Sequence, residues 1–199
     1  MDAFLIATGV VALAEVGDKT QLLAFMLAAR FKKPLPIIAG ILFATLVNHA
    51  LAGALGNWLI SLAGPQTLRW VLGISFIAMA LWLLIPDKLD EDDTRIAPYG
   101  VFLTTLLAFF LAEMGDKTQI ATVALAARFP DFIAVVAGTT LGMLLANVPA
   151  VLFGEKISRR LPTRWIHALA ALIFCALGIA TLLGAGDALS LASPLPGNP

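Results

Sequence analysis

A seven-residue string of charged and polar residues lies inside an apolar run and then occurs a second time. The first copy is Glu15–Gln21 (EVGDKTQ), within the apolar run Phe4–Ala29, and the second is Glu113–Gln119 (EMGDKTQ), within another apolar run. A charge at the centre of a membrane-spanning helix costs about 3 kcal/mol on insertion scales. A chain that bears this cost twice with the same residues is expected to use them, and the remaining sequence is expected to hold the two strings face to face.

The composition predicts the class of protein. Of the 199 residues, 60% are hydrophobic and 13% are charged, and the mean hydropathy is +0.92. A soluble domain of this length does not need so much apolar surface, so we expect an all-α polytopic membrane protein. The net charge of zero argues against a nucleic-acid partner, and the single cysteine, Cys175, excludes an internal disulfide.

Six apolar runs are long enough to cross a bilayer, which takes about 20 helical residues. Proline and glycine residues fall in the breaks between them. The N-terminus lacks the basic residues of a cleaved signal peptide, so the first run is expected to remain as a spanning helix. The six predicted spans are Phe4–Ala29, Ile37–Ser61, Leu68–Ile85, Gly100–Ala127, Phe132–Phe153 and Trp165–Leu183.

The chain contains an internal duplication. A shift of 98 residues aligns 13–31 with 111–129, with 13 identities in 19 positions. Each half holds three predicted spans, and an odd number places the second half in the membrane with the opposite orientation. The expected fold is therefore six transmembrane helices in two inverted-topology three-helix repeats. The predicted repeats are residues 1–86 and 100–184, an acidic linker occupies 87–99, and a flexible tail occupies 185–199.

The placement of lysine and arginine predicts the orientation. Outside the two motifs, nine of these residues fall on one side of the six spans and only Arg69 and Arg128 on the other. The first side is predicted to be cytoplasmic, so the 86–99 loop is cytoplasmic and both termini lie outside. The nine residues are Arg30, Lys32, Lys33, Lys88, Arg95, Lys156, Arg159, Arg160 and Arg164.

The two motifs together offer oxygen ligands. Carboxylate, hydroxyl and amide oxygens suit hard divalent cations such as Mn²⁺, Mg²⁺ and Ca²⁺, whereas Zn²⁺ and Cu⁺ prefer sulfur or imidazole. Gly17 allows the helix to break at this depth, where an unwound turn must line a cavity. The predicted metal ligands are Glu15, Asp18, Glu113 and Asp116, and the supporting polar residues are Lys19, Thr20, Gln21, Lys117, Thr118, Gln119, Asn48 and Asn147.

The charges of the two motifs favour an exchange mechanism. Four carboxylates and two ammonium groups sum to −2, which one divalent cation or two protons neutralise. Carboxylates crowded together in a low dielectric take up protons more readily than isolated ones. In the alternative interpretation, Glu15–Lys19 and Glu113–Lys117 are intrahelical ion pairs that only let charged helices pack. The recurrence of the whole string in the opposite half argues against that alternative.

Other polar residues have simpler interpretations. Asn48, His49 and Asn147 lie at related depths in the second span of each half, and they either support the site or form interhelical hydrogen bonds. His167 is expected at the membrane interface. The acidic stretch 87–93 lacks the glycine and terminal glutamate of an EF-hand loop, so a solvated linker is expected there. The functional alternative is a cytoplasmic acidic cluster that gathers cations.

The duplicated E-x-G-D-K-T motif resembles that of the Golgi-type manganese/calcium–proton exchangers and their bacterial manganese-exporting relatives, long grouped as uncharacterised membrane proteins. The resemblance covers essentially the whole chain, because a motif heads each half. It implies a secondary transporter that exports a divalent cation, Mn²⁺ ahead of Ca²⁺, in exchange for protons. It also implies a bacterial inner-membrane location, a cation held by the four motif carboxylates, and no resident cofactor. The expected partners are the cation and the bilayer, with a homo-oligomer left open.

Two further functions stay open on the residues alone. One is export of a small organic cation or amino acid, whose ammonium group the carboxylates would bind, and the other is a structural membrane protein. An organic solute would favour aromatic residues beside the carboxylates, and the motif neighbours are Val16, Leu22, Met114 and Ile120. An enzyme is not expected, because the sequence contains no metalloprotease, nucleophile-elbow or cofactor fingerprint.

Overall fold

The computed structural model of the chain describes residues 1–62, 64–85, 100–153 and 163–184. Within these ranges the regular structure is entirely helical. The predictions for the 87–99 linker and the 185–199 tail lie outside the described residues. In chain order the helices are α1 (Asp2–Glu15), α2 (Lys19–Phe31), α3 (Pro34–Leu62), α4 (Pro65–Leu83), α5 (Val101–Ala112), α6 (Lys117–Arg128), α7 (Phe132–Phe153) and α9 (Thr163–Leu182).

Four of these helices, α3, α4, α7 and α9, are long and apolar enough to cross a membrane. The prediction of an all-helical membrane protein is therefore confirmed. The other two predicted spans, 4–29 and 100–127, are each divided into two shorter helices, α1 and α2 in the first and α5 and α6 in the second. Both breaks fall at a motif, so the charged strings are not helical throughout. The count of six spans stays a prediction.

The backbone of each motif explains why the helix breaks there. Gly17 and Gly115 have φ values of +84° and +77°, in the left-handed region that favours glycine. The residues that follow them, Asp18 and Asp116, have extended backbones and are the N-caps of α2 and α6. Each Gly-Asp pair thus ends one helix and begins the next.

The helices of the two halves begin at equivalent positions. The starts of α2 and α6, of α3 and α7, and of α4 and α9 are each 98 residues apart, which is the shift of the sequence repeat. Local sequence therefore sets the same succession of helices twice.

Close packing between the halves repeats as well. A Cβ added to Gly40 on α3 would lie 2.9 Å from the Phe102 carbonyl oxygen on α5. A Cβ added to Gly138 on α7 would lie 2.6 Å from the Phe4 carbonyl oxygen on α1. Both members of the second contact are 98 residues from their counterparts in the first. In each half the second predicted span, α3 or α7, is therefore packed through glycine against the broken span of the other half.

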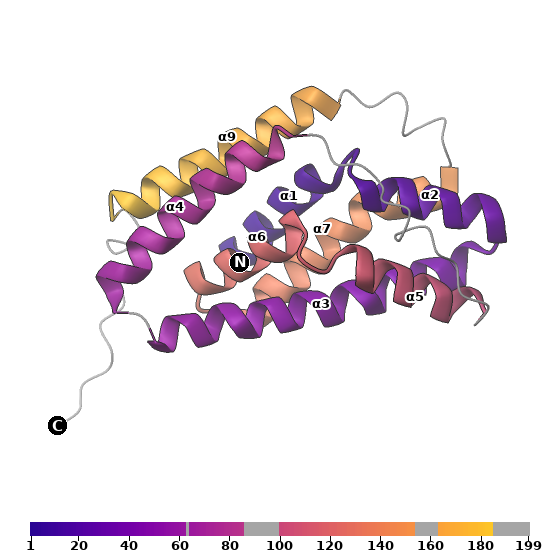
Figure 1. Ribbon diagram of the computed structural model, residues 1–199, viewed down its shortest axis with the longest axis horizontal. Helices are drawn as coiled ribbons and strands as arrows, with labels where there is room; N and C mark the ends of the chain where they lie inside the picture. The colour runs from indigo at the N-terminus through magenta and orange to yellow at the C-terminus, as the bar shows by residue number, and fades with distance from the viewer. Residues whose placement is uncertain (63, 86–99, 154–162, 185–199) are drawn as a thin grey trace.

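α4 and α9 form an antiparallel pair along one side of the molecule (Figure 1). A Cβ added to Gly73 would meet Leu182, and the rings of Phe76 and Phe174 lie 6.0 Å apart, so residue numbers rise along α4 as they fall along α9. The pair packs on the broken spans through α4 against α6 and α9 against α1. Its apolar residues join those of α1 and α6 in one hydrophobic core.

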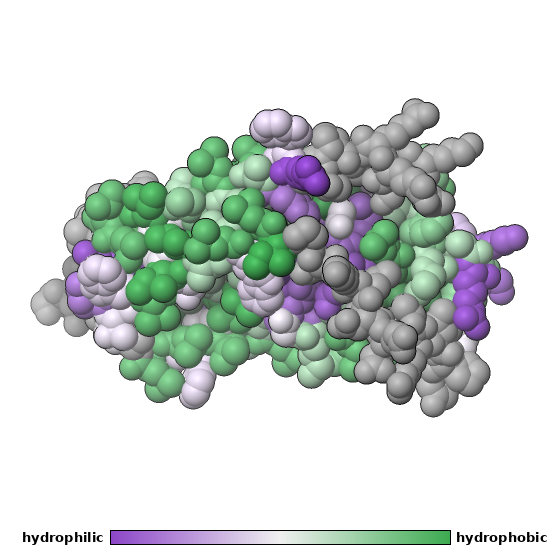
Figure 2. All heavy atoms as spheres, turned by 45° about the horizontal axis from the view of Figure 1, so that its top comes forward, coloured by the Kyte–Doolittle hydropathy of each residue, from purple (hydrophilic) through white to green (hydrophobic). Residues whose placement is uncertain are grey.

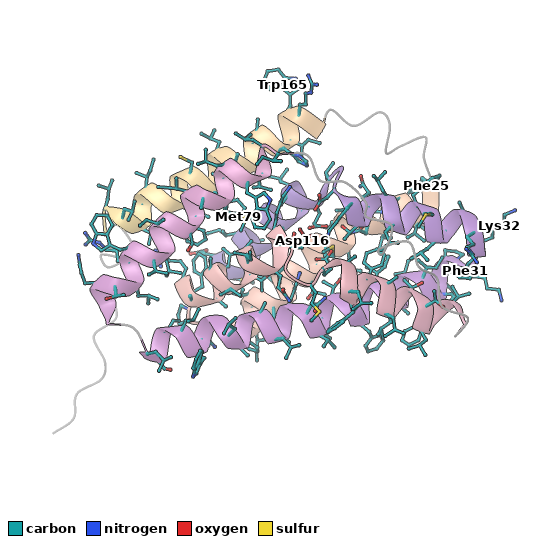
Figure 3. The ribbon with its side chains drawn as sticks, in the orientation of Figure 1. Phe25, Phe31, Lys32, Met79, Asp116 and Trp165 are labelled. Atoms are coloured by element: carbon teal, nitrogen blue, oxygen red, sulfur yellow. The ribbon has the colours of Figure 1, made fainter. Side chains whose placement is uncertain are left out.

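The outer surface is largely apolar, as the membrane prediction requires. Leucine, isoleucine, valine, phenylalanine and tryptophan side chains are exposed on all the long helices. Figure 2 shows hydrophobic residues over most of one face, with hydrophilic residues gathered near its middle and at one end. Figure 3 places Asp116 in the interior of the helices, whereas Trp165 and Lys32 lie at the periphery. The four motif carboxylates are therefore buried beneath an apolar outer surface.

Candidate metal centre

The two helix breaks have the same internal hydrogen bonds. Gly17 N–H donates to Gln21 Oε1 at 2.9 Å, and Gly115 N–H donates to Gln119 Oε1 at 2.7 Å. Each glutamine therefore satisfies a backbone group that the break leaves without a helical partner. Both glutamines were predicted as supporting polar residues, and in this arrangement their side-chain oxygens accept hydrogen bonds from the backbone of the breaks.

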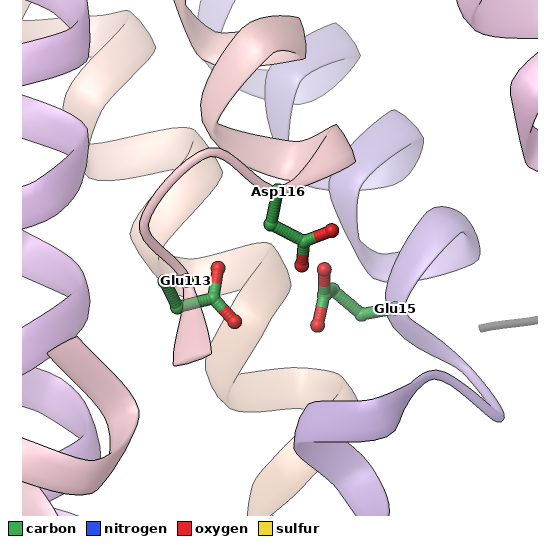
Figure 4. Close-up of side chains that lie close together, drawn as sticks. All are labelled: Glu15, Glu113 and Asp116. Atoms are coloured by element: carbon green, nitrogen blue, oxygen red, sulfur yellow. The ribbon is translucent and has the colours of Figure 1, made fainter. Parts of the chain in front are cut away.

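Three carboxylates converge between the two breaks. One carboxylate oxygen from each of Glu15, Glu113 and Asp116 lies within 4.8 Å of the others. Glu15 and Glu113 are fully buried, and Asp116 is 5% exposed. Figure 4 shows the three side chains reaching toward one another from both halves of the chain. Residues about 100 positions apart in sequence thus form one buried acidic cluster.

Asp18, the fourth predicted ligand, is close to this cluster but outside the group of three. It is 2% exposed and follows Gly17 at the first break. Asp18 is close enough to Glu113 for their carboxylates to interact electrostatically, as Glu15 and Asp116 also do. All four predicted ligands therefore share one buried region, and three of them lie near enough together to hold a single ion.

Glu15 and Glu113 have different surroundings although they occupy equivalent positions. Thr20 Oγ1 donates to Glu15 Oε2 at 2.6 Å, and Thr118 Oγ1 donates to Glu15 Oε1. Both oxygens of Glu113 are buried without a hydrogen-bond partner among the described residues. A buried carboxylate in that condition is costly unless a cation or a proton accompanies it. Glu113 is thus the side chain of the cluster best placed to receive a ligand.

Two asparagines supply further buried oxygens. Asn48 Nδ2 donates to the Phe110 carbonyl at 3.0 Å, one turn before Glu113, and Asn147 Nδ2 donates to the Met143 carbonyl at 3.1 Å. In both residues the amide oxygen is buried and makes no hydrogen bond within the described part of the chain. The Ala146 carbonyl, next to Asn147, accepts from Gln21 Nε2 at 2.9 Å. Each asparagine is therefore held beside a motif with its oxygen available.

His49 was left open by the sequence. It is fully buried on α3, and neither ring nitrogen has a hydrogen-bond partner within the described ranges. No contact places it on the three-carboxylate group, so it is not added to the candidate ligands.

The motif lysines do not take the positions expected on a continuous helix. The break lies between Glu15 and Lys19, and likewise between Glu113 and Lys117, so the alternative of i, i+4 pairs within one helix does not describe either motif. Lys117 is 3% exposed, and its Nζ donates to the Ile85 carbonyl at the end of α4 at 2.8 Å. Lys19 is only partly buried. The second motif therefore also anchors α4.

His167 was missed as a residue of this region. Its expected place at the membrane interface stays a prediction, and the structure shows it partly buried on α9 with Nε2 2.7 Å from the Val16 carbonyl. A carbonyl only accepts, so the ring N–H donates to it. The two residues are 151 positions apart, and the sequence contained no local signal for the contact. α9 is thus tied to the break in the first motif.

The sequence of the chain is similar to that of known proteins. The family described as "Divalent cation/proton antiporter GDT1" matches residues 3–91 and, separately, residues 101–188. Each match contains one motif. No solved structure matches the chain.

Named relatives cover most of the chain. A protein of Vibrio cholerae named "Putative manganese exporter" is 50% identical over 182 residues, which is 91% of this chain and 90% of the relative. GDT1-like protein 5 of Arabidopsis thaliana is 28% identical over 88% of this chain and 93% of its own length. GDT1-like protein 3 of Oryza sativa subsp. indica is 24% identical over 90% of this chain and 73% of its own length.

Proposed function

We propose, because the chain belongs to the GDT1 family of divalent cation/proton antiporters, that it exports Mn²⁺ from the cytoplasm in exchange for protons. The cation would occupy the cluster of Glu15, Glu113 and Asp116, with Asp18 close by. Mn²⁺ is chosen ahead of Ca²⁺ partly because the Vibrio cholerae relative is named as a manganese exporter.

One observation carries the proposal: three carboxylates from two distant segments lie within 4.8 Å of one another and are at most 5% exposed. Two negative charges at that separation repel by about 3 kcal/mol at an effective dielectric constant of about 20. The cluster therefore needs positive charge, and a divalent cation or protons can supply it. A site that alternates between these two occupants couples export of one to import of the other.

The donor atoms fit Mn²⁺. Glu113 offers two unpartnered oxygens, and the Asn48 and Asn147 amide oxygens are unpartnered within the described residues. A small set of carboxylate and amide oxygens suits Mn²⁺ in octahedral geometry, whereas Ca²⁺ takes six to eight oxygens and softer metals prefer sulfur or imidazole. The Thr20 and Thr118 hydroxyls donate to Glu15, so we assign them to positioning that carboxylate.

The architecture we propose is two inverted halves of three spans, each with one broken span, and a cation site near the middle of the membrane. The repeated contacts at Gly40 and Gly138, and the antiparallel α4–α9 pair, support this arrangement. Inverted repeats commonly place substrate between the halves at broken helices. With the predicted orientation, α2 and α5 are the cytoplasmic parts of the broken spans, and α1 and α6 are the outer parts.

The test is ion flux in proteoliposomes with an imposed pH gradient. The wild-type chain should move Mn²⁺ against proton flow, and Glu113→Gln should abolish this movement. Asp2→Asn is the matched control, because Asp2 is an exposed carboxylate at the start of α1. Parallel assays with Ca²⁺, Mg²⁺ and a small organic cation decide the substrate. Wild-type Mn²⁺–proton exchange by Glu113→Gln would show that the cluster is a packing feature.

A further inference from the structure

The α4–α9 pair is attached unequally to the two broken spans. α4 packs on α6 and α9 packs on α1, while the described residues contain no comparable contact of α4 with α5 or of α9 with α2. The repeat makes α9 the counterpart of α4 and α5 the counterpart of α1. If the two halves were arranged identically around the pair, a contact of α9 with α1 would therefore require an equal contact of α4 with α5. The pair therefore lies toward α1 and α6 and away from α2 and α5, as Figure 1 also shows.

Two hydrogen bonds hold the pair at the motifs in this position. The His167 ring N–H donates to the Val16 carbonyl in the first break, and Lys117 Nζ donates to the Ile85 carbonyl at the end of α4. Since α4 and α9 are antiparallel, Ile85 and His167 lie at the same end of the pair. Both bonds thus fasten one end of the pair to the cation region.

The sequence repeat identifies the counterpart of the His167 contact. A shift of 98 residues places Arg69 of α4 at the position of His167 and Met114 of the second break at the position of Val16. Arg69 Nε is buried and has no hydrogen-bond partner among the described residues. An N–H donor is therefore present at the equivalent site of the other half, and its counterpart acceptor is the Met114 carbonyl.

The packing of α4 on α6 leaves space for movement. A cavity of about 170 Å³ lies between α3, α4 and α6, and nearly all of its lining is apolar. It is bounded by Leu59 of α3, Leu68 and Ser75 of α4, and Ile120 and Ala124 of α6, among others. The cavity is partly open to the outside, so α4 and α6 are not in contact along their whole length and less packing energy opposes their separation.

We propose that His167 and Arg69 are paired positioning residues that hold the α4–α9 pair in two alternative places. In the arrangement described here, His167 bonds the Val16 carbonyl and α9 lies on α1. In the other arrangement, Arg69 bonds the Met114 carbonyl, α4 lies on α5 and α9 lies on α2. This inference rests on the inverted halves of the proposed function, because exchange of their roles is what relates the two arrangements.

The exchange would change which side of the cation site is covered. The pair now lies over α1 and α6, the outer parts of the broken spans in the predicted orientation. In the second arrangement it would lie over α2 and α5, the cytoplasmic parts. His167 and Arg69 would then act on transport through the position of a helix pair, without touching the cation.

The experiment measures distances between spin labels in lipid nanodiscs. The native Cys175 is replaced by serine, and one label is placed at Leu172→Cys on α9, where the native side chain is 66% exposed. The second label is placed at Leu22→Cys on α2 or at Leu5→Cys on α1, both exposed positions. The pH and the Mn²⁺ concentration are varied until the wild-type protein shows both label-to-label distances.

His167→Ala should raise the population with α9 close to α2 about fivefold, the effect of one hydrogen bond on an equilibrium constant. Arg69→Ala should lower that population by a similar factor, and His167→Gln, which keeps an N–H donor, should restore the wild-type balance. General destabilisation cannot give opposite shifts from equivalent positions.

Shifts in the same direction, no shift, or a single distance under all conditions would overturn the inference. The readout requires no transport measurement. If the two substitutions shift the population in opposite directions but the protein does not transport Mn²⁺, the inference stands and the proposed substrate is contradicted.

Discussion

Glu15 and Glu113 hold the same place in two nearly identical strings, yet the structure gives them different partners. Glu15 accepts hydrogen bonds from Thr20 and Thr118, one from each motif, while both oxygens of Glu113 are unpartnered in the described residues. The backbones of the two motifs differ far less: both break at glycine, both begin the next helix at aspartate, and both are braced by glutamine.

The comparison shows that the backbone of a motif and the partners of its side chains are determined by different parts of the chain. Local sequence sets the backbone of each motif, because the hydrogen bonds that stabilise each break join residues three or four apart. The neighbouring half sets the side-chain partners, because Thr118 reaches Glu15 across 103 residues. A duplicated sequence can therefore give two motifs with the same backbone and with carboxylates that have different hydrogen-bond partners.

The largest expected effect removes a charge from the cluster. Asp116→Asn keeps the shape of the side chain and changes the summed charge of the motifs from −2 to −1, so Mn²⁺ affinity should fall by about 100-fold or more. Asp18→Asn should act similarly if the fourth carboxylate serves the same ion. Isothermal titration with Mn²⁺ measures both, and Asp2→Asn is the control for a surface charge. Unchanged affinity in Asp116→Asn would exclude this carboxylate as a ligand.

The next effect compares Glu113 with Glu15 directly. At a Mn²⁺ concentration of about 100 times Kd, binding should stabilise the wild-type fold by about 2.7 kcal/mol. Glu113→Gln should lose nearly all of this stabilisation, because its two oxygens are the unpartnered ones in the cluster. Glu15→Gln should retain part of it. Thermal unfolding with and without Mn²⁺ gives both values, and a larger loss in Glu15→Gln would reverse the assignment.

A smaller effect tests the hydroxyl donors. Thr118→Val removes one hydrogen bond to buried Glu15 and should cost about 2 kcal/mol of folding stability, since the acceptor is charged and buried. Thr118→Ser keeps the hydroxyl and should cost much less. Thr20→Val should match Thr118→Val if both hydroxyls serve Glu15 equally. The free energy of unfolding in denaturant measures the series, and stability equal to wild type in Thr118→Val would contradict the contact.

The smallest effect tests the glycine backbone conformation that the two motifs share. Gly115→Ala should cost about 1–2 kcal/mol through its positive φ alone, because a Cβ at Gly115 would meet no atom within 4 Å. Gly115→Asn should cost less, since asparagine tolerates the left-handed region. The same unfolding assay gives both values. Equal stability of wild type and Gly115→Ala would mean that the break does not depend on glycine.

Much of the candidate site could be predicted from the sequence. The two strings stood out because charges inside apolar runs are costly, and Gly17 indicated where the helix could break. The three clustered carboxylates and the two asparagines with available oxygens were all among the predicted residues. The bonds from the glycine N–H groups to the glutamine oxygens were not predicted, because they form only where the helix is broken.

The sequence by itself therefore determined the membrane class, the duplicated order of helices and the residues of the acidic cluster. Each follows from composition, spacing or a local backbone preference. Only the tertiary structure decided that both threonine hydroxyls bind Glu15, that Lys117 bonds Ile85 and that His167 bonds Val16. All but the Thr20 bond join segments 32 to 151 residues apart. The two motifs are nearly identical in sequence, so the packing of the two halves determines which half forms each of these hydrogen bonds.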